Sequence, residues 1–347
     1  MKRVFVATAV LALLCLGTLA QATVIPTVPV GDPGNVGELS GVGAAGGYGP
    51  DRICGSVGYA YNIGKYEVTA AQYTDFLNKV ARTDTYGLYS TYMGDPTYYY
   101  LGCNIQRSGS SGSYTYSVAA DWANRPVNYV SYWDSCRFAN WLHNGQPTGL
   151  QSPLTTEDGA YYINGYNSYD GRTIQRKAGW QWAVTSEDEW YKAAYYKGGT
   201  SNAYWDYPMQ SNVPTVPSND VTSPDGGNNA NFYQSGYTIG SPYCRTEVGE
   251  FENSESAYNT FDQGGNVWEW NEAIVYQDAN YAYRGLRGGS FDYYYNNLQA
   301  SHRVSYNPTS EYYDFGFRVS EVVPEPSSII ALAGGLISLL GLKRRRV

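Results

Sequence analysis

The strongest constraint on the fold is the contrast between long irregular segments and an unusual supply of tyrosine. Residues 93–124 and 197–246 show few periodic apolar patterns and are rich in Gly, Ser, Pro and Asn. Segments of that length without regular structure are uncommon in compact domains. Disorder is a poor explanation, because disordered segments contain few aromatic residues and this chain has 37 tyrosines. Since tyrosine joins a large rigid ring to a hydroxyl that satisfies backbone carbonyls, the sequence predicts a loop-rich fold held by aromatic side chains.

Three short helices and one strand are predicted between the irregular segments. Each helix begins at a Ser or Thr that is followed three residues later by Gln, Asp or Glu, which is a capping-box pattern. The predicted helices cover residues 69–81, residues 131–143 and a segment that begins at Ser186. Residues 59–63 alternate between aromatic or aliphatic and small or polar side chains, as in a half-buried strand.

The N-terminal end predicts export. Lys2 and Arg3 precede an apolar run that ends in small residues, and this is the pattern of a cleaved signal peptide over residues 1–22. Residues 23–50 are rich in Gly, Pro and Val and are interpreted as a lead-in rather than a packed core. No second block of distinct composition follows, so a single domain is assigned to residues 51–321.

The C-terminal end resembles a PEP-CTERM sorting signal, assigned to residues 322–347. A Pro-Glu-Pro triplet at residues 324–326 precedes an apolar span at 329–342 and a basic tail. As a helix this span would reach about 21 Å, less than the roughly 30 Å of a bilayer core. The resemblance implies transient membrane association and a sorting enzyme that processes the tail. A permanent transmembrane anchor is the alternative.

Charge and cysteine content narrow the possible functions. The net charge is −8 and the only basic run lies in the tail, so nucleic acid is not an expected partner. Four cysteines remain once the signal peptide is removed: Cys54, Cys103, Cys136 and Cys244. An even number in an oxidising compartment predicts two disulfides, and the sequence leaves all three pairings open.

Six motifs follow one another in an order that is found in one family. They are residues 61–69 (YNIGKYEVT), 126–131 (PVNYVS), 187–190 (EDEW), 265–270 (GNVWEW), 287–291 (RGGSF) and 316–318 (GFR). As an ordered set they resemble the formylglycine-generating enzymes and the sulfatase-modifying-factor superfamily over most of the mature chain. The resemblance implies an α+β fold of the formylglycine-generating-enzyme type, which is C-type-lectin-like and loop-rich with few short helices and strands.

The copper chemistry of the active enzymes is not expected in this chain. In those enzymes a pair of thiols lies between the last two motifs, and soft sulfur ligands select Cu(I). Residues 287–319 contain no cysteine, and three consecutive tyrosines at 293–295 occupy the region of the first one. A non-haem iron centre, as in related sulfoxide synthases, needs two or three histidines, and the chain has only His143 and His302. The second hypothesis is nevertheless a diverged metal-dependent oxidoreductase of the non-haem iron type, with ligands that the sequence does not identify.

Calcium is the cofactor that the resemblance does imply. In relatives the GNVWEW segment wraps a Ca²⁺ ion with a side chain, two backbone carbonyls and a glutamate, which are here Asp262, Gly265, Val267 and Glu269. This mixture of carboxylate and carbonyl oxygens is what calcium selects. Asn231 resembles part of a second calcium site of the family.

A tyrosine-rich surface between the last two motifs is the candidate ligand site. Its predicted residues are Tyr293, Tyr294, Tyr295, Asn296, Asn297, His302, Arg303 and Tyr306. Antibody loops use a similar mixture, because tyrosine gives rigid contact area while asparagine and serine adapt their hydrogen bonds. Tyrosines that simply fill the fold are the competing explanation. The leading hypothesis is an exported protein of the cell envelope or the extracellular space that binds a polysaccharide or a surface protein.

Overall fold

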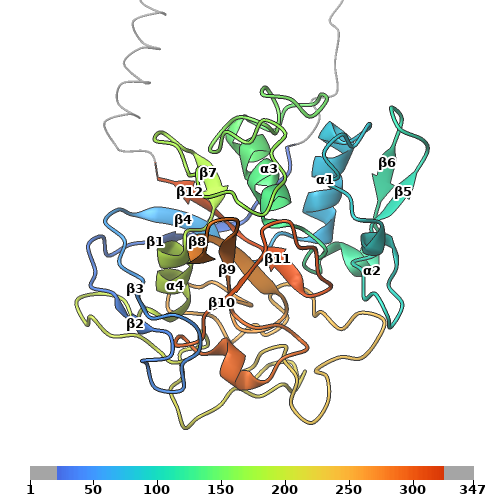
Figure 1. Cartoon of the computed structure of the whole chain (residues 1–347). Helices are drawn as coiled ribbons and strands as arrows, with labels where there is room; N and C mark the ends of the chain where they lie inside the picture. Colours follow the sequence, from blue (N-terminus) through green and yellow to red (C-terminus); the bar gives the residue numbers. More distant parts are fainter. Residues whose placement is uncertain (1–21, 324–347) are drawn as a thin grey trace, which may run out of the picture.

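The computed structural model describes residues 22–323, and two four-stranded sheets form its centre (Figure 1). The first sheet is antiparallel and has the strand order β1 (Thr27–Val30), β4 (Tyr61–Gly64), β12 (Val319–Val322) and β7 (Trp182–Val184). The second has the order β10 (Val304–Tyr306), β9 (Ala282–Arg287), β8 (Trp268–Gln277) and β11 (Phe315–Phe317). In the second sheet β11 runs parallel to β8, and the other pairs are antiparallel.

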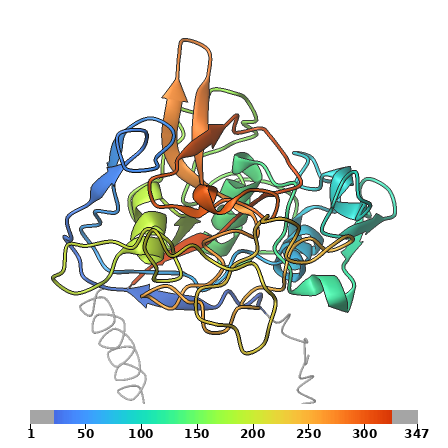
Figure 2. The ribbon, with the colours of Figure 1, turned by 90° about the horizontal axis from the view of Figure 1, so that it is seen from below.

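Two small ribbons complete the strands of the described chain. They are β2 (Glu38–Ser40) with β3 (Arg52–Cys54), and β5 (Gln106–Ser108) with β6 (Thr115–Ser117). The far ends of β8 and β9 project from the body as a two-stranded ribbon (Figure 2). Irregular pairing interrupts this ribbon between Asn271 and Tyr276, so its outer part is not a simple continuation of the central sheet.

The predicted helices are confirmed, since all three form with their capping boxes. They are α1 (Ala70–Val80), α3 (Tyr132–His143) and α4 (Glu187–Tyr195), and the capping residues are Thr69, Ser131 and Ser186. One further short helix, α2 (Ala120–Ala123), and the 3-10 turns η1 (Thr91–Gly94) and η2 (Tyr295–Leu298) lie in the loops. The predicted α+β class is also confirmed, with few short elements and long connections.

Aromatic side chains form much of the core between the helices and the sheets. Phe76 of α1 meets Phe138 of α3 with ring centroids 5.2 Å apart and ring planes 78° apart. Phe138 also contacts Phe317 of β11 at 5.3 Å, which connects both helices to the second sheet. Edge-to-face pairs of this kind add to the stability that burial gives.

Tyrosine hydroxyls stabilise the loops in the way that the sequence predicts. Tyr73 donates to the carbonyl of Leu88 at 2.8 Å, and Tyr195 donates to the carbonyl of Leu298 at 3.0 Å. Between α4 and β8 the described chain forms only isolated bridges and turns. Buried rings therefore pack against irregular backbone while their hydroxyls satisfy its carbonyls.

The proposed lead-in is part of the folded domain. Residues 27–30 form β1, which pairs with β4, and Val30 is fully buried. Residues 38–40 form β2 against β3. The interpretation of residues 23–50 as a separate lead-in is therefore wrong, because strand pairing depends on a partner that a local pattern does not reveal.

Candidate functional site

A cavity of about 530 Å³ lies on one face of the second sheet, and all four strands contribute to its wall. Its lining consists of Tyr48, Trp268, Leu286, Tyr293, Asn296, Asn297, His302, Val304, Tyr306, Tyr312, Tyr313, Asp314 and Phe315. The parallel pairing of β11 with β8 sets Phe315 beside Trp268, although these residues are far apart in sequence. The rest of the wall comes from the loop between β9 and β10, from the loop that precedes β11 and from Tyr48 in the segment between β2 and β3.

Five of the eight residues of the predicted surface line this cavity. They are Tyr293, Asn296, Asn297, His302 and Tyr306. They come from η2, from the loops on either side of it and from β10, so the chain folds the candidate residues around a hollow rather than displaying them on a flat face.

The other three residues of the predicted surface lie elsewhere. Tyr294 is 56% exposed and its ring packs edge-on against Tyr233, and Tyr295 is 37% exposed. Arg303 is buried, and its guanidinium binds the carboxylate of Glu187 at 2.7 and 2.8 Å. The prediction of Arg303 as a ligand-binding residue is therefore wrong, because its charge is already paired inside the protein.

Sequence reasoning missed the deepest residues of the cavity. Trp268 belongs to the GNVWEW motif, where a structural role was assigned to it, and Asp314 and Phe315 directly precede the GFR motif. Their position beside two family motifs was the available signal. Their convergence, however, depends on the β8–β11 pairing.

Asp314 is the buried carboxylate of the cavity, with only 3% of its surface exposed. Ser290 donates a hydrogen bond to its Oδ2 at 3.1 Å, and within residues 22–323 no other side chain donates to this carboxylate. Burial raises the pKa of Asp314 to about 7, and the nearby carboxylate of Asp292 raises it further while Arg245 opposes this. Asp314 therefore lies at the cavity wall with an incompletely compensated charge.

The two histidines do not form a metal site. His302 stacks on Tyr48 at 4.9 Å in the cavity wall, and burial lowers its pKa to about 4. His143 lies at the end of α3, where its Nδ1 accepts a hydrogen bond from the backbone of Gln181. Within the described residues no three His, Cys, Asp or Glu side chains gather in a metal-binding arrangement. The iron hypothesis thus has no identified ligand set there.

The residues of the implied calcium site have other partners. Arg318 binds both carboxylate oxygens of Glu269 at 2.6 and 2.7 Å, and Trp190 donates to Oε2 at 2.7 Å. Glu269 and Arg318 are both fully buried. A divalent cation at Glu269 would meet this buried arginine at close range, where charge repulsion is strong. Glu269 therefore does not fit the role that the resemblance implies.

The remaining members of the calcium set are also held by the protein. Asp262 accepts the backbone N–H of Gly249 at 2.6 Å, and burial raises its pKa to about 7. Gly265 and Val267 are buried beside the 231–232 segment, and Asn231 donates to the carbonyl of Cys244 at 2.9 Å. Among the side-chain oxygens of these five residues, the Oδ1 atom of Asn231 is buried without a hydrogen-bond partner in the described part of the chain. We therefore assign no calcium ion to this set.

The predicted disulfides are absent from the structure. Cys54, Cys103, Cys136 and Cys244 are all buried free thiols. Cys103 and Cys136 belong to the main hydrophobic core, whereas Cys54 packs with α4. Burial raises the pKa of all four thiols, which makes them poor nucleophiles. The prediction of two disulfides from the even number of cysteines is therefore wrong. Buried thiols also serve as small apolar side chains of the core.

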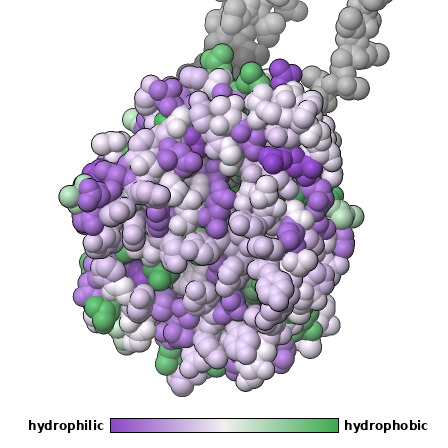
Figure 3. All heavy atoms as spheres, turned by 45° about the vertical axis from the view of Figure 1, so that its right-hand side comes forward, coloured by the Kyte–Doolittle hydropathy of each residue, from purple (hydrophilic) through white to green (hydrophobic). Residues whose placement is uncertain are grey.

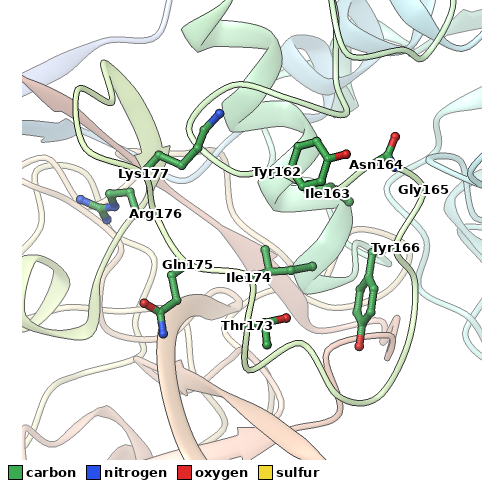
Figure 4. Close-up of a pocket in the computed structure, with 10 residues that line it drawn as sticks. All are labelled: Tyr162, Ile163, Asn164, Gly165, Tyr166, Thr173, Ile174, Gln175, Arg176 and Lys177. Carbon is green, nitrogen blue, oxygen red and sulfur yellow. The ribbon is translucent and has the colours of Figure 1, made fainter.

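A second cavity of about 660 Å³ lies within the loop of residues 162–177 (Figure 4). Its cationic side chains are already paired. Arg176 binds Glu189 at 2.6 Å and Glu272 at 2.8 Å, and Lys177 binds Asp158. Since one loop supplies the whole lining and its charges are engaged, this cavity is a weaker candidate than the one on the second sheet.

The face of the molecule in Figure 3 is mostly hydrophilic or neutral, with small separate hydrophobic patches. Such a surface shows no broad apolar area of the kind that marks a large protein interface. The cavity on the second sheet is therefore the main candidate site.

The fold and the cavity define a loop-rich α+β domain with an aromatic hollow on one central sheet. The chain belongs to the sulfatase-modifying factor enzyme 1-like domain family, whose model matches residues 56–322. No curated protein matches the sequence.

Solved structures with a similar fold have low sequence identity to this chain. CarF superposes with a TM-score of 0.50 at 20% identity, over 87% of this chain and 100% of CarF. Variable protein 1 of Treponema denticola gives 0.49 at 21% identity, over 86% and 95% of the two chains. PvdO from Pseudomonas aeruginosa gives 0.45 at 17% identity, over 86% and 92%. The likeness to CarF supports the fold and leaves the function to the site itself.

Proposed function

We propose that this protein is an exported, non-catalytic member of its family that binds an extracellular ligand in the aromatic cavity of the second sheet. The observation that carries the proposal is the lining itself. Tyrosine, tryptophan and asparagine side chains surround about 530 Å³, and no thiol of the described residues lies among them. Copper chemistry of the family type needs thiolates at this place.

A saccharide of the extracellular matrix is the ligand class that this lining suits best. Sugar rings have apolar faces that pack on aromatic rings, and hydroxyl groups that pair with amides and phenols. The cavity offers Trp268 and Tyr306 for packing, and Asn296 and Asn297 for hydrogen bonds. Its volume falls in the range of small-ligand sites. A flat surface for a protein partner would need a larger apolar area.

The location of the protein follows from its two end segments. Export rests on the signal-peptide pattern of residues 1–22, and envelope sorting rests on the PEP-CTERM resemblance of residues 322–347. Nearly all of both segments lies outside the described residues. Within residues 22–323, no helix is long and apolar enough to cross a bilayer.

The binding proposal is tested with immobilised extracellular polysaccharide and variants of single tyrosines. Tyr306→Ala opens the cavity wall and should weaken binding by about tenfold or more. The reason is that packing of a ligand ring on one aromatic side chain contributes on the order of 1–3 kcal/mol. Tyr162→Ala is the matched control, since Tyr162 is 58% exposed and lines the other cavity. Equal loss in both variants, or none in either, would remove the aromatic cavity from the binding function.

Metal analysis of the purified protein tests the non-catalytic part of the proposal. We expect neither copper nor iron in stoichiometric amount, because the described residues provide no converging thiolate or histidine ligands. One equivalent of either metal would instead favour the oxidoreductase hypothesis.

A further inference from the structure

Several rings in the cavity wall stand at steep angles to their neighbours, whereas Tyr48 and His302 stack with ring planes 16° apart. The planes of Trp268 and Tyr293 differ by 80° with centroids 5.4 Å apart. Tyr306 makes an angle of 73° with both Tyr312 and Phe315, at 5.1 and 5.2 Å. Rings arranged in this way form the corners of a box rather than a flat stack. The face of each ring carries negative electrostatic potential, which attracts cations.

A carboxylate completes the box. Asp314 lies in the wall with 3% exposure, and within residues 22–323 Ser290 is the one side chain that donates a hydrogen bond to its carboxylate. Burial raises the pKa of the Tyr293 phenol, and the nearby carboxylates of Asp314 and Asp292 raise it further. The carboxylates of these acids and the negative faces of the rings would therefore both attract a cation.

No lysine or arginine lines the cavity, and its one histidine is neutral above about pH 5 because burial lowers the pKa of His302 to about 4. Elsewhere in the protein, basic side chains do cover aromatic rings: Lys197 lies 4.0 Å from the centre of Trp205, and Arg125 lies 4.0 Å from that of Tyr243. Within the described chain, no such cation covers a ring of the cavity lining. The box therefore lacks an internal cation.

We propose that this aromatic box binds the ammonium group of an organic cation, with Asp314 as its counter-charge. The inference rests on the ligand-binding function proposed above and narrows its ligand class. An amino sugar of a polysaccharide carries such a group, and so does a choline-type compound. An anionic polysaccharide is disfavoured, since its charges would approach Asp314 and Asp292 without a cation in the lining.

Titration calorimetry of the full mature protein at about pH 8, where most Asp314 side chains are ionised because their pKa is about 7, tests this inference with two matched pairs of compounds. Choline is compared with 3,3-dimethylbutan-1-ol, which has the same shape without the charge, and glucosamine is compared with glucose. Desolvated cation–π and ion-pair contacts predict that at least one charged compound binds roughly tenfold or more tightly than its neutral partner. This comparison uses the unaltered protein, so it does not depend on the folding of a variant.

Asp314→Asn keeps the shape of the side chain and removes its charge. It should abolish the preference for the charged compound and leave the affinity for the neutral partner unchanged. Asp220→Asn is the matched control, because Asp220 is an exposed acid outside the cavity and should keep the preference. Unchanged preference in Asp314→Asn would overturn the role of Asp314.

The same series separates this inference from the proposed function. Equal affinity for charged and neutral partners, or no binding of either ammonium compound at millimolar concentration, overturns the ammonium site. If neutral oligosaccharides still bind and Tyr306→Ala removes their binding, the general ligand-binding function stands. If no compound or polysaccharide binds, both proposals fail.

Discussion

Replacement of Asp314 with asparagine should stabilise the protein above neutral pH and leave it nearly unchanged in acid. The carboxyl is 3% exposed, and burial raises its pKa from 3.8 to about 7. Asp292 adds to this shift, while Arg245 and the hydrogen bond from Ser290 reduce it. Asparagine can keep the hydrogen bond from Ser290 and has no proton to lose.

The size of the effect follows from the two pKa values. Below about pH 4 the carboxyl is protonated in both the folded and the unfolded chain, so it does not alter the free energy of unfolding. Between about pH 4 and pH 7 the folded state holds the proton more tightly, and stability falls as pH rises. A difference of about three pH units at about 1.4 kcal/mol each gives about 4 kcal/mol as the full loss above pH 7.

Urea denaturation of the wild type and of Asp314→Asn at several pH values between about 4.5 and 8.5 measures this directly. The free energy of unfolding of the variant should exceed that of the wild type by an amount that increases with pH and levels off at about 4 kcal/mol. The comparison is needed because the pKa of Asp262 is also raised to about 7, so both proteins share that part of the pH dependence. A constant difference across the whole range would refute the reasoning.

Three further outcomes are expected. Glu187→Gln should lower the free energy of unfolding by roughly 3–5 kcal/mol in urea at pH 7, because three arginines lose a shared buried carboxylate; a loss near zero would contradict this. Protein purified without reductant and unfolded in guanidinium should react with four equivalents of a thiol reagent, whereas two disulfides would give none. Gly265→Ala should prevent folding, as judged by circular dichroism, because a Cβ there would lie 2.1 Å from the carbonyl oxygen of Asn231; Gly240→Ala, in open space, should fold normally.

Local patterns predicted the helices, because their signals lie within a few residues. Thr69 and Ser186 each exchange two hydrogen bonds with the side chain and backbone of a residue three positions later. Such contacts form wherever the chain turns into a helix, whatever surrounds it. Tyrosine content likewise predicted loops held by rings, since each phenol carries its own hydrogen-bonding group.

The candidate site was only partly predictable, because its chemistry depends on partners that are distant in sequence. Tyr293 and Tyr306 were found from their composition and their place between two family motifs, but Arg303 and Glu269 were assigned roles that their internal ion pairs do not fit. A sequence shows that a side chain is charged and does not show which opposite charge neutralises it. Asp314 was missed although it lies two residues before the GFR motif, because its burial depends on the distant pairing of β11 with β8.

The position of β12 has a mechanical consequence for a protein that is held by its C-terminus. β12 is hydrogen-bonded to β4 on one side and to β7 on the other. A pull on the chain at Val323 would act along the strand and load both ladders in shear at once. Arg318, directly before β12, is fixed by Glu269 and by the carbonyls of Gly64 and Phe261. Tension at Val323 would therefore have to break two ladders and a buried ion pair together.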